Sequence, residues 1–175
     1  MTQQVSPENL DRTLDKKGYF LDSLTSVQGL SLKDLDVEIK HNAIVYNHLQ
    51  DDWFTNFCIL NNVGEKDQPT LKQMLRNIIP KTCYFLLGDD NNEIFACGMC
   101  VLESEYIGLF DIVTTEKYRN RGYGSKIIQN ILKWGKDNGA NYAYLQVMLN
   151  NAPALKLYSK LGFKEIYRYW YRIKE

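Results

Sequence analysis

The sequence has few cysteines, no excess of charge of one sign and no long apolar run. Four cysteines in 175 residues are too few for a disulfide-stabilised scaffold. Lysine and arginine number 21 and aspartate and glutamate also number 21, so no general positive field would attract nucleic acid or an anionic membrane. We therefore expect neither of these partners, and we expect any anion to be bound locally.

A targeting or membrane-spanning segment is also missing from the sequence as given. The first residues, MTQQVSPENLDRTLDKK, contain no apolar signal core, and no stretch approaches the roughly 20 apolar residues that cross a bilayer. Apolar residues still make up 45% of the chain, which is enough for a substantial core. The composition predicts a folded, soluble, cytoplasmic protein.

Cysteine and histidine lack the spacing of metal ligands. Cys97 and Cys100 form a CxxC, but the surrounding run EIFACGMCVLES is typical of a strand, in which these two positions face opposite ways. His41 and His48 show no ligand spacing around them. We expect structural thiols and no metal site.

The apolar pattern predicts a chain of mixed helices and strands. Gly18, Gly139 and Gly162 are placed as helix stops, and a loop is expected around Gly29. Helices are expected at 7–17, starting at Ser6, twice within 50–79, at 125–138 and after Asn150. Strands are expected at 19–27, 37–46, 83–87, 94–102, 106–113, 142–148 and 163–173, the third to fifth of them as an antiparallel meander. This order is typical of the α/β and α+β classes.

The run IVTTEKYRNRGYGSKII, residues 112–128, joins a buried strand directly to a helix. A helix N-terminus carries unpaired N–H groups and partial positive charge, and Gly122 and Gly124 would let a phosphate approach the backbone. Arg119, Arg121 and Lys126 would add cations. The segment indicates a pyrophosphate site, and the alternative is an ordinary turn with solvated basic residues.

Two other phosphate-binding motifs are excluded by single residues. A P-loop requires GxxxxGK[ST], whereas the lysine here follows Gly124 by two positions without the earlier glycine. A dinucleotide-binding GxGxxG would require glycine in place of Ile127.

The order of several short motifs resembles the GNAT family of acetyl-coenzyme A-dependent N-acetyltransferases over about residues 80–173. Arg119, Gly122 and Gly124 match its Q/R-x-x-G-x-G/A loop. The later L-x-V, N-x-x-A-x-x-L-Y and G-F motifs are met by Leu145, Val147, Asn151, Ala154, Leu157, Tyr158, Gly162 and Phe163. The resemblance implies a mixed, mostly antiparallel twisted sheet flanked by helices. Residues 50–175 would form the acetyltransferase domain, with 1–49 as an additional N-terminal helix and strand segment.

The resemblance also implies acetyl-coenzyme A as cosubstrate and names the residues that would hold it. The main chain of Ile112, Val113 and Thr114 would pair with the pantetheine arm like an added strand. Asn151 would face the pantetheine, and Ala154 to Tyr158 would border the sulfur. A helix cap is the other reading of Asn151. Backbone N–H groups for the pyrophosphate would come from Asn120, Arg121, Gly122, Tyr123, Gly124 and Ser125.

The expected catalytic residues are one acid and three candidate bases. By the resemblance, Tyr158 would donate a proton to the leaving thiolate; the alternative is a buried core tyrosine. Gln146 stands where some members carry a glutamate and cannot accept a proton. Glu103, Glu105 and Asp111 remain as candidate bases, and we expect Asp111 to be buried within the apolar run GLFDIV, either as base or as a cap of a backbone group.

The leading hypothesis is transfer of acetyl to a primary amine of a small molecule or peptide by direct attack in a ternary complex. The alternative is a catalytically silent acyl-coenzyme A-binding module. Trp53 and Phe54 are candidates for the acceptor pocket. Unpaired strand edges in the N-terminal segment would favour a homodimer.

Overall fold

The protein is described by a computed structural model over residues 7–36, 39, 43–89, 91 and 93–174. The chain forms two compact units, which are described separately. The larger unit is Ser31–Ala143, and the smaller one combines Met1–Leu30 with Tyr144–Glu175. Strand β6 (Tyr142–Met148) crosses the boundary between them and agrees with its predicted range.

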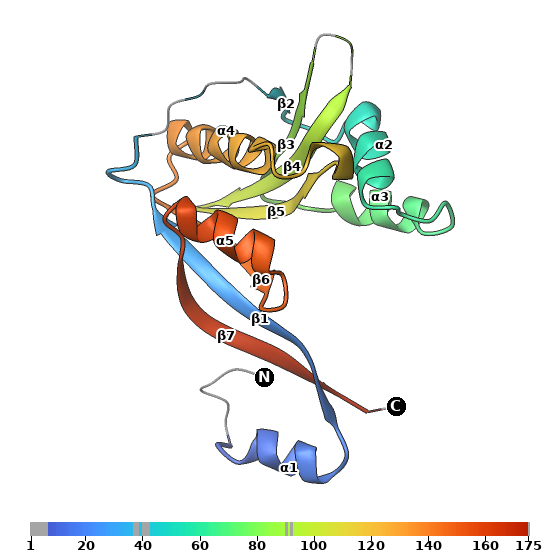
Figure 1. Cartoon of the computed structure of the whole chain (residues 1–175), viewed down its shortest axis with the longest axis vertical. Helices are drawn as coiled ribbons and strands as arrows, with labels where there is room; N and C mark the ends of the chain where they lie inside the picture. Colours follow the sequence, from blue (N-terminus) through green and yellow to red (C-terminus); the bar gives the residue numbers. More distant parts are fainter. Residues whose placement is uncertain (1–6, 37–38, 40–42, 90, 92, 175) are drawn as a thin grey trace. The chain divides into compact units, whose positions relative to one another are not determined.

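The larger unit is built on antiparallel strands in the order β2–β3–β4–β5 (Figure 1). The strands span Ile44–Tyr46, Lys81–Gly88, Ile94–Glu103 and Tyr106–Thr114. The predicted meander of the last three strands is confirmed. The strand expected at 37–46 is observed only at its end, and residues 37–38 and 40–42 lie outside the described part.

Three α-helices belong to this unit. α2 (Asp51–Leu60) and α3 (Gln68–Arg76) confirm the two helices expected within 50–79. α4 (Tyr123–Asp137) begins two residues before its predicted start, so Gly124 and Ser125 belong to its first turn rather than to a loop. Its buried residues recur at helical spacing: Ile127, Ile128, Ile131, Leu132 and Gly135.

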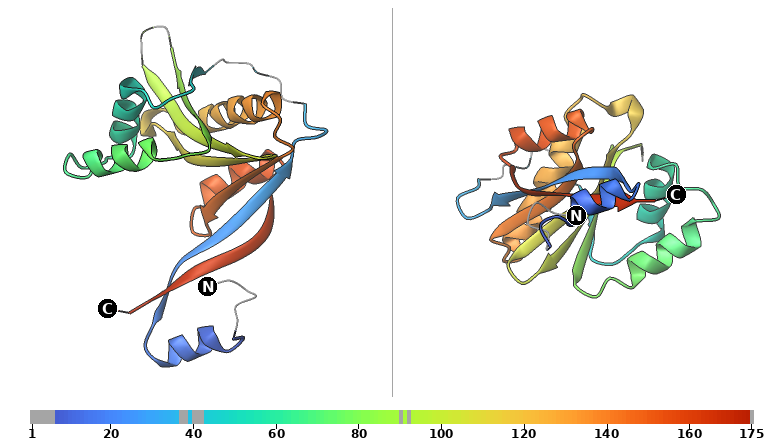
Figure 2. Two further views of the ribbon diagram at one scale, coloured as in Figure 1. Left: turned by 180° about the vertical axis from the view of Figure 1, so that it is seen from behind. Right: turned by 90° about the horizontal axis from the view of Figure 1, so that it is seen from below.

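Side-chain alternation along β4 places these helices on opposite faces of the sheet, as Figures 1 and 2 show. Cys97 and Met99 join the core cluster of Trp53, on the side of α2 and α3. Gly98 faces α4: a Cβ atom there would lie 3.2 Å from Cδ1 of Ile131. The absence of a side chain at Gly98 therefore lets α4 pack close to the sheet.

The smaller unit contains the strand order β6–β1–β7. β1 (Phe20–Ser31) pairs antiparallel with β7 (Lys164–Ile173) over almost its whole length. The loop expected around Gly29 is wrong, because Gly29 lies within β1 opposite Lys164. Strand β7 provides the backbone hydrogen-bond partners of β1 at this position, whereas the glycine in the local sequence suggested a loop.

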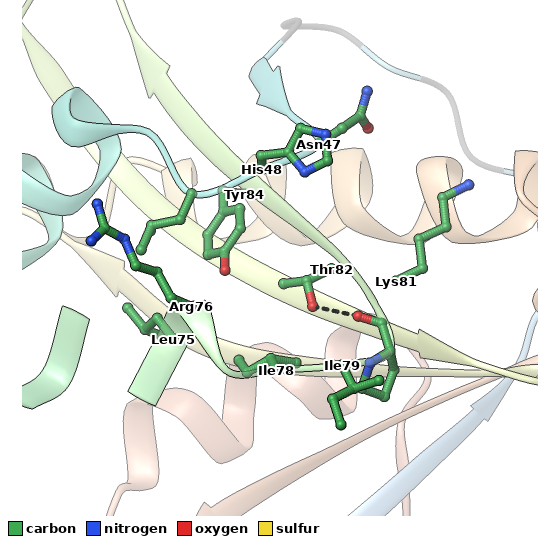
Figure 3. A pocket seen from close by; sticks show the side chains of 11 residues that line it. Asn47, His48, Leu75, Arg76, Ile78, Ile79, Lys81, Thr82 and Tyr84 are labelled. Atoms are coloured by element: carbon green, nitrogen blue, oxygen red, sulfur yellow. Dashed lines mark hydrogen bonds between the residues drawn. The ribbon is translucent and has the colours of Figure 1, made fainter. Parts of the chain in front are cut away.

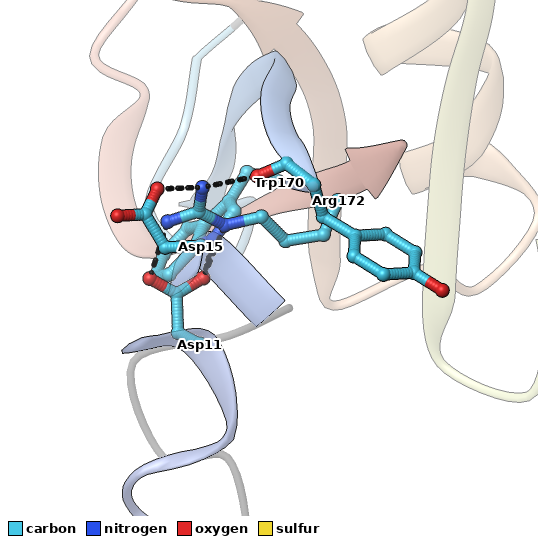
Figure 4. A network of polar contacts seen from close by, with 5 residues as sticks. Asp11, Asp15, Trp170 and Arg172 are labelled. Atoms are coloured by element: carbon cyan, nitrogen blue, oxygen red, sulfur yellow. Dashed lines mark hydrogen bonds and ion pairs between the residues drawn. The ribbon is translucent and has the colours of Figure 1, made fainter. Parts of the chain in front are cut away.

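Two helices complete the smaller unit. α5 (Ala152–Lys160) confirms the predicted helix before Gly162. α1 (Leu10–Lys16) lies within the predicted 7–17 but starts later, and Ser6 lies outside the described residues. Arg172 of β7 anchors α1 through Nη2 to Oδ2 of Asp11 at 2.8 Å and through Nη1 to Oδ1 of Asp15 at 2.7 Å (Figure 4).

None of the helices in the described ranges combines the length and the apolar character that crossing a membrane requires. The boundary expected between residues 49 and 50 remains a prediction. Residues 20–31, which belong to the expected N-terminal segment, hydrogen-bond to the last strand of the chain.

Candidate active site

A β-bulge interrupts β5 near its end. Met99 of β4 faces Phe110, but Cys97 faces Val113, so β5 places two residues, Asp111 and Ile112, opposite one residue of β4 and therefore has one extra residue. Asp111 has φ +53°, a left-handed conformation that a β-strand does not normally contain. The bulge therefore redirects the chain at the segment where the pantetheine arm is expected.

Asp111 is exposed, so the prediction of a buried carboxylate is wrong. The bulge takes this residue out of the alternation that buries its neighbours Ile107 and Leu109. Protein atoms around the carboxylate nevertheless desolvate it and raise its pKa. The result is a solvent-accessible carboxylate that holds its proton more firmly than an isolated aspartate.

The segment after β5 is fixed to the start of β4. Thr115 donates its backbone N–H to the carbonyl of Phe95 at 2.9 Å and its hydroxyl to the carbonyl of Ile94 at 2.9 Å. A short 3-10 helix, Glu116–Tyr118, follows. The Nζ of Lys117 pairs with Oε1 of Glu93 at 2.8 Å, so this lysine is not available to a ligand.

Aromatic rings form the base of the loop at residues 115–122. The rings of Tyr118 and Tyr123 each lie 4.5 Å from that of Phe95, between centroids. These contacts hold both ends of the loop against β4. Sequence analysis missed this cluster, although the tyrosines on both sides of RNRG were a visible signal.

The N-terminus of α4 presents open backbone donors. Asn120 and the N-cap Gly122 have φ +61° and +82°, and no side chain caps the helix. The first helical bond runs from Lys126 N to the carbonyl of Gly122, so the amides from Gly122 to Ser125 have no acceptor within the helix. Successive amides beside left-handed residues form an anion-binding concavity, which matches the predicted diphosphate site.

Cations border these amides. The guanidinium carbon of Arg121 lies 5.4 Å from the centroid of the Tyr118 ring, and Nζ of Lys126 lies 4.6 Å from that of Tyr123. Arg119 is exposed and has no ion pair among the described residues. The predicted cations, Arg119, Arg121 and Lys126, therefore lie in the same short segment as the open amides of α4.

The other end of β5 carries the remaining candidate bases. Glu105 is occupied: its carboxylate accepts from Nδ2 of Asn141 at 2.8 Å, and its carbonyl accepts from the amides of Asn141 and Tyr142. Glu103 is exposed at the end of β4. Asp111 follows Glu105 by six residues, which is about 20 Å along a strand. The structure thus does not bring these two glutamates to the bulge.

In the smaller unit, Tyr158 and Asn151 occupy α5. Tyr158 is 8% exposed, and burial raises its pKa, so its phenol keeps a proton to donate. Its hydroxyl has no hydrogen-bond partner among the described residues, while its ring packs edge-on against Phe163. Asn151 caps α5, because its Oδ1 accepts a hydrogen bond from Ala154 N at 3.2 Å. This is the helix-cap role that the sequence analysis gave as one of two alternatives.

Comparison with known proteins shows the family of this chain. A sequence model of the acetyltransferase (GNAT) family matches residues 43–163, which is more than half of the chain. The chain belongs to the GNAT family. The uncharacterized N-acetyltransferase YobR of Bacillus subtilis (strain 168) is 29% identical over 174 residues, covering 97% of this chain and 70% of YobR.

Solved GNAT structures show the same fold. A GCN5-related N-acetyltransferase from Sphaerobacter thermophilus aligns with a TM-score of 0.71 and 13% identity, over 97% of this chain and 56% of that one. AAC(6')-Iy, solved with a bisubstrate analog, CoA-S-monomethyl-acetylneamine, aligns with a TM-score of 0.61 and 14% identity, over 77% of this chain and 99% of that one. The predicted GNAT fold is confirmed, and this chain spans little more than half of the Sphaerobacter protein.

Two groups of side chains in this GNAT chain belong to the core rather than to a ligand site. Trp53 is fully buried and donates its indole N–H to the carbonyls of Phe85 and Gly98, and Phe54 is 5% exposed. Neither is placed to line an open acceptor pocket. All four cysteines are free and buried, and no cluster of three metal-ligating residues occurs in the described ranges.

Proposed function

We propose that this GNAT chain transfers the acetyl group of acetyl-coenzyme A to a primary amine of a small molecule or peptide. The observation that carries the proposal is the uncapped start of α4, which follows a bulged strand and is flanked by Arg119 and Arg121. This donor set fits a diphosphate: amides without acceptors, two left-handed residues and nearby cations. The coenzyme A analog bound to AAC(6')-Iy supports the same cosubstrate.

The thioester carbonyl and the leaving thiolate each require a separate protein group. The amine attacks the thioester carbonyl directly in a ternary complex, the amide forms, and the thiolate leaves. A backbone N–H of β5 near Val113 would polarise that carbonyl. In this proposal Tyr158 donates its proton to the departing sulfur, which its raised pKa supports, because the phenol is protonated at neutral pH.

Asp111 is the proposed base. It is accessible to solvent, lies on the bulge and has a raised pKa, which makes its ionised form a stronger proton acceptor than an ordinary aspartate. The carboxylate of Glu105 is already bound to Asn141. Gln146, which replaces the glutamate of some GNAT members, instead accepts a hydrogen bond from the hydroxyl of Tyr169 at 2.5 Å.

The alternative of a catalytically silent acyl-coenzyme A-binding module has no support from the comparisons, since YobR and the Sphaerobacter protein are both named as N-acetyltransferases. Tyr158→Phe separates the two functions. We expect turnover, followed by thiol release with a panel of amines, to fall at least tenfold, while the calorimetric affinity for acetyl-coenzyme A is retained. An unchanged rate would remove the acid role of Tyr158, and the absence of turnover in the parent chain would favour the silent module.

A further inference from the structure

A cavity of about 480 Å³ lies in the larger unit where β3 begins. Its walls come from residues 47–49, from the end of α3 with the following turn, and from the first residues of β3 (Figure 3). The volume is within the range of small-molecule sites, about 300–1,000 Å³. β3 and β5 are both antiparallel to β4, so the cavity lies at the end of the sheet where β5 begins, away from the loop at 115–122.

One part of the lining is apolar. Leu49, Leu75, Ile78 and Ile79 belong to the lining together with Tyr84, which is itself 2% exposed. In Figure 3 the isoleucines stand on the opposite side of this ring from His48. Ile79 is 96% exposed, an unusual position for a large apolar side chain. A hydrocarbon chain placed here would cover apolar surface that now faces water.

The polar part of the lining is cationic, although the whole chain has no net charge. The lining contains Arg76, Lys81 and His48 and no carboxylate. Lys81 is occupied, because its Nζ donates to Oδ1 of Asn138 at 2.7 Å and lies over the Trp134 ring. Arg76 has no ion pair with any described residue, although its charge, after that of Lys72, helps to lower the pKa of Asp51. Its guanidinium is therefore the cation of the lining that no direct ion pair occupies.

The lining also contains a free hydrogen-bond donor, the hydroxyl of Tyr84. In Figure 3 the Tyr84 ring stands between Arg76 and Thr82. The Tyr84 hydroxyl has no hydrogen-bond partner in the described part of the chain, and burial raises its pKa, so it is protonated and able to donate. The hydroxyl of Thr82 is occupied by the carbonyl of Pro80 at 2.9 Å. Arg76 and Tyr84 thus give the lining a cation and a hydroxyl donor, two kinds of group from which a carboxylate accepts hydrogen bonds.

The nearby helix end limits the charge of the ligand. Arg76 is the last residue of α3, so the partial negative charge of the helix C-terminus faces this region. This end repels a doubly charged phosphate more strongly than a singly charged carboxylate, and neither a helix N-terminus nor a glycine contributes to the lining. From charge, shape and free donors we infer that this cavity binds an aliphatic monocarboxylate, with its chain against the isoleucines and its carboxylate on Arg76 and Tyr84.

Calorimetry and amide NMR with the full chain test this inference, with octanoate as the probe below its micelle concentration. We expect octanoate to bind at least tenfold more tightly than octanamide, which lacks the charge, and than acetate, which lacks the chain. Arg76→Gln should weaken octanoate at least tenfold. Arg12→Gln, the same change at an exposed arginine of α1 without a partner among the described residues, should leave binding unchanged.

Other results overturn the inference. Equal binding of octanamide and octanoate would indicate an apolar groove without anion selectivity, and displacement of octanoate by equimolar inorganic phosphate would indicate a general anion site. Equal affinity of the Arg76→Gln and Arg12→Gln variants would exclude the cavity. If Arg76→Gln does not fold, Tyr84→Phe replaces it and should weaken octanoate severalfold; full affinity there is again contradictory. Acetyl-coenzyme A is absent from these titrations, so their outcome does not depend on the proposed acetyl transfer.

Discussion

The two ends of β5 differ in how much of their hydrogen-bonding capacity is used within the fold. At the start of the strand, the carbonyl and carboxylate of Glu105 bind the chain segment at Asn141 and Tyr142. At the other end, the bulge leaves Asp111 exposed, and the amides that open α4 have no acceptor in the helix. The first arrangement stabilises a turn, and the second remains open to a ligand.

The difference shows that a charged residue beside a strand is no guide to function by itself. Glu105 and Asp111 are both acidic residues of the same short region, yet a bound side-chain amide occupies one and left-handed backbone exposes the other. The cost of holding a non-glycine residue at positive φ is on the order of 1–2 kcal/mol. Asp111 and Asn120 both carry this cost at the proposed site.

The largest effect should come from Asp111→Asn. If Asp111 is the base, turnover should fall about a hundredfold, which is within the range for loss of a general base, while acetyl-coenzyme A affinity is kept. The rate of the parent should rise with pH through the pKa of Asp111, which lies above the ordinary value, because the base must be ionised. Steady-state rates between pH 4 and 8 measure this dependence. If Glu103→Gln loses a similar amount of turnover while Asp111→Asn stays active, the base is Glu103, beside the start of β5.

Asp111→Asn should stabilise the fold at neutral pH, although it lowers turnover. A carboxyl with a raised pKa binds its proton more tightly in the folded chain, so its contribution is fully present below the unfolded pKa and is lost as pH rises through the folded pKa. Asp111→Asn should therefore raise the urea midpoint at pH 7 and not at pH 3.5. Glu65→Gln, at an exposed residue in the α2–α3 loop, serves as control and should not show this pattern.

Gly122→Ala should weaken acetyl-coenzyme A at least tenfold by forcing a side chain onto left-handed backbone at the diphosphate site. Gly139→Ala is a matched control at the other end of α4: φ is +93° there against +82° at Gly122, and a Cβ atom meets nothing within 4 Å at either position. Both variants should lose roughly 1–2 kcal/mol of unfolding free energy. Calorimetry should find weaker binding in the first variant alone, and equal affinities would argue against the site.

Arg119→Gln should have a smaller effect, about fivefold in affinity or about 1 kcal/mol, because it removes one cation and leaves the backbone donors in place. Raising the salt concentration should reduce the difference between the variant and the parent. Arg12→Gln should bind like the parent in the same calorimetric titration. A salt-independent loss at Arg119 would point to disturbed folding instead of lost charge.

Glu105→Gln should have no measurable effect on acetyl-coenzyme A binding. It should reduce the unfolding free energy by about 1 kcal/mol, since a charge-assisted hydrogen bond to Asn141 becomes a neutral one. Urea unfolding measures the loss. Reduced cosubstrate affinity in this variant would show that the two ends of β5 are not independent.

Local pattern predicted most of the larger unit. The helical spacing of Ile127, Ile128 and Ile131 predicted α4, and the glycines of RNRGYG predicted the open backbone at its start, because both signals lie within one short segment. The alternation along β4 correctly separated Cys97 from Cys100, and burial of all four thiols agrees with a structural role.

The features that depend on distant partners were missed. β1 continues through Gly29 because β7 pairs with it from the other end of the chain. The bulge depends on the register between β4 and β5, and the local sequence GLFDIV contains no signal for it. The exposure of Asp111 was therefore not predicted. The cavity at Arg76 is assembled from two segments, 47–49 and 75–84, which are distant in the sequence and carry no motif.

The most direct test of the account is the response of the backbone amides to coenzyme A in a two-dimensional nitrogen–proton NMR titration. We predict that the amides of Gly122, Tyr123, Gly124 and Ser125 shift most, and that those of Glu105 and Asn141 do not move. Saturating coenzyme A that leaves the first four signals unchanged, or that shifts the Glu105 end instead, would contradict the central claim.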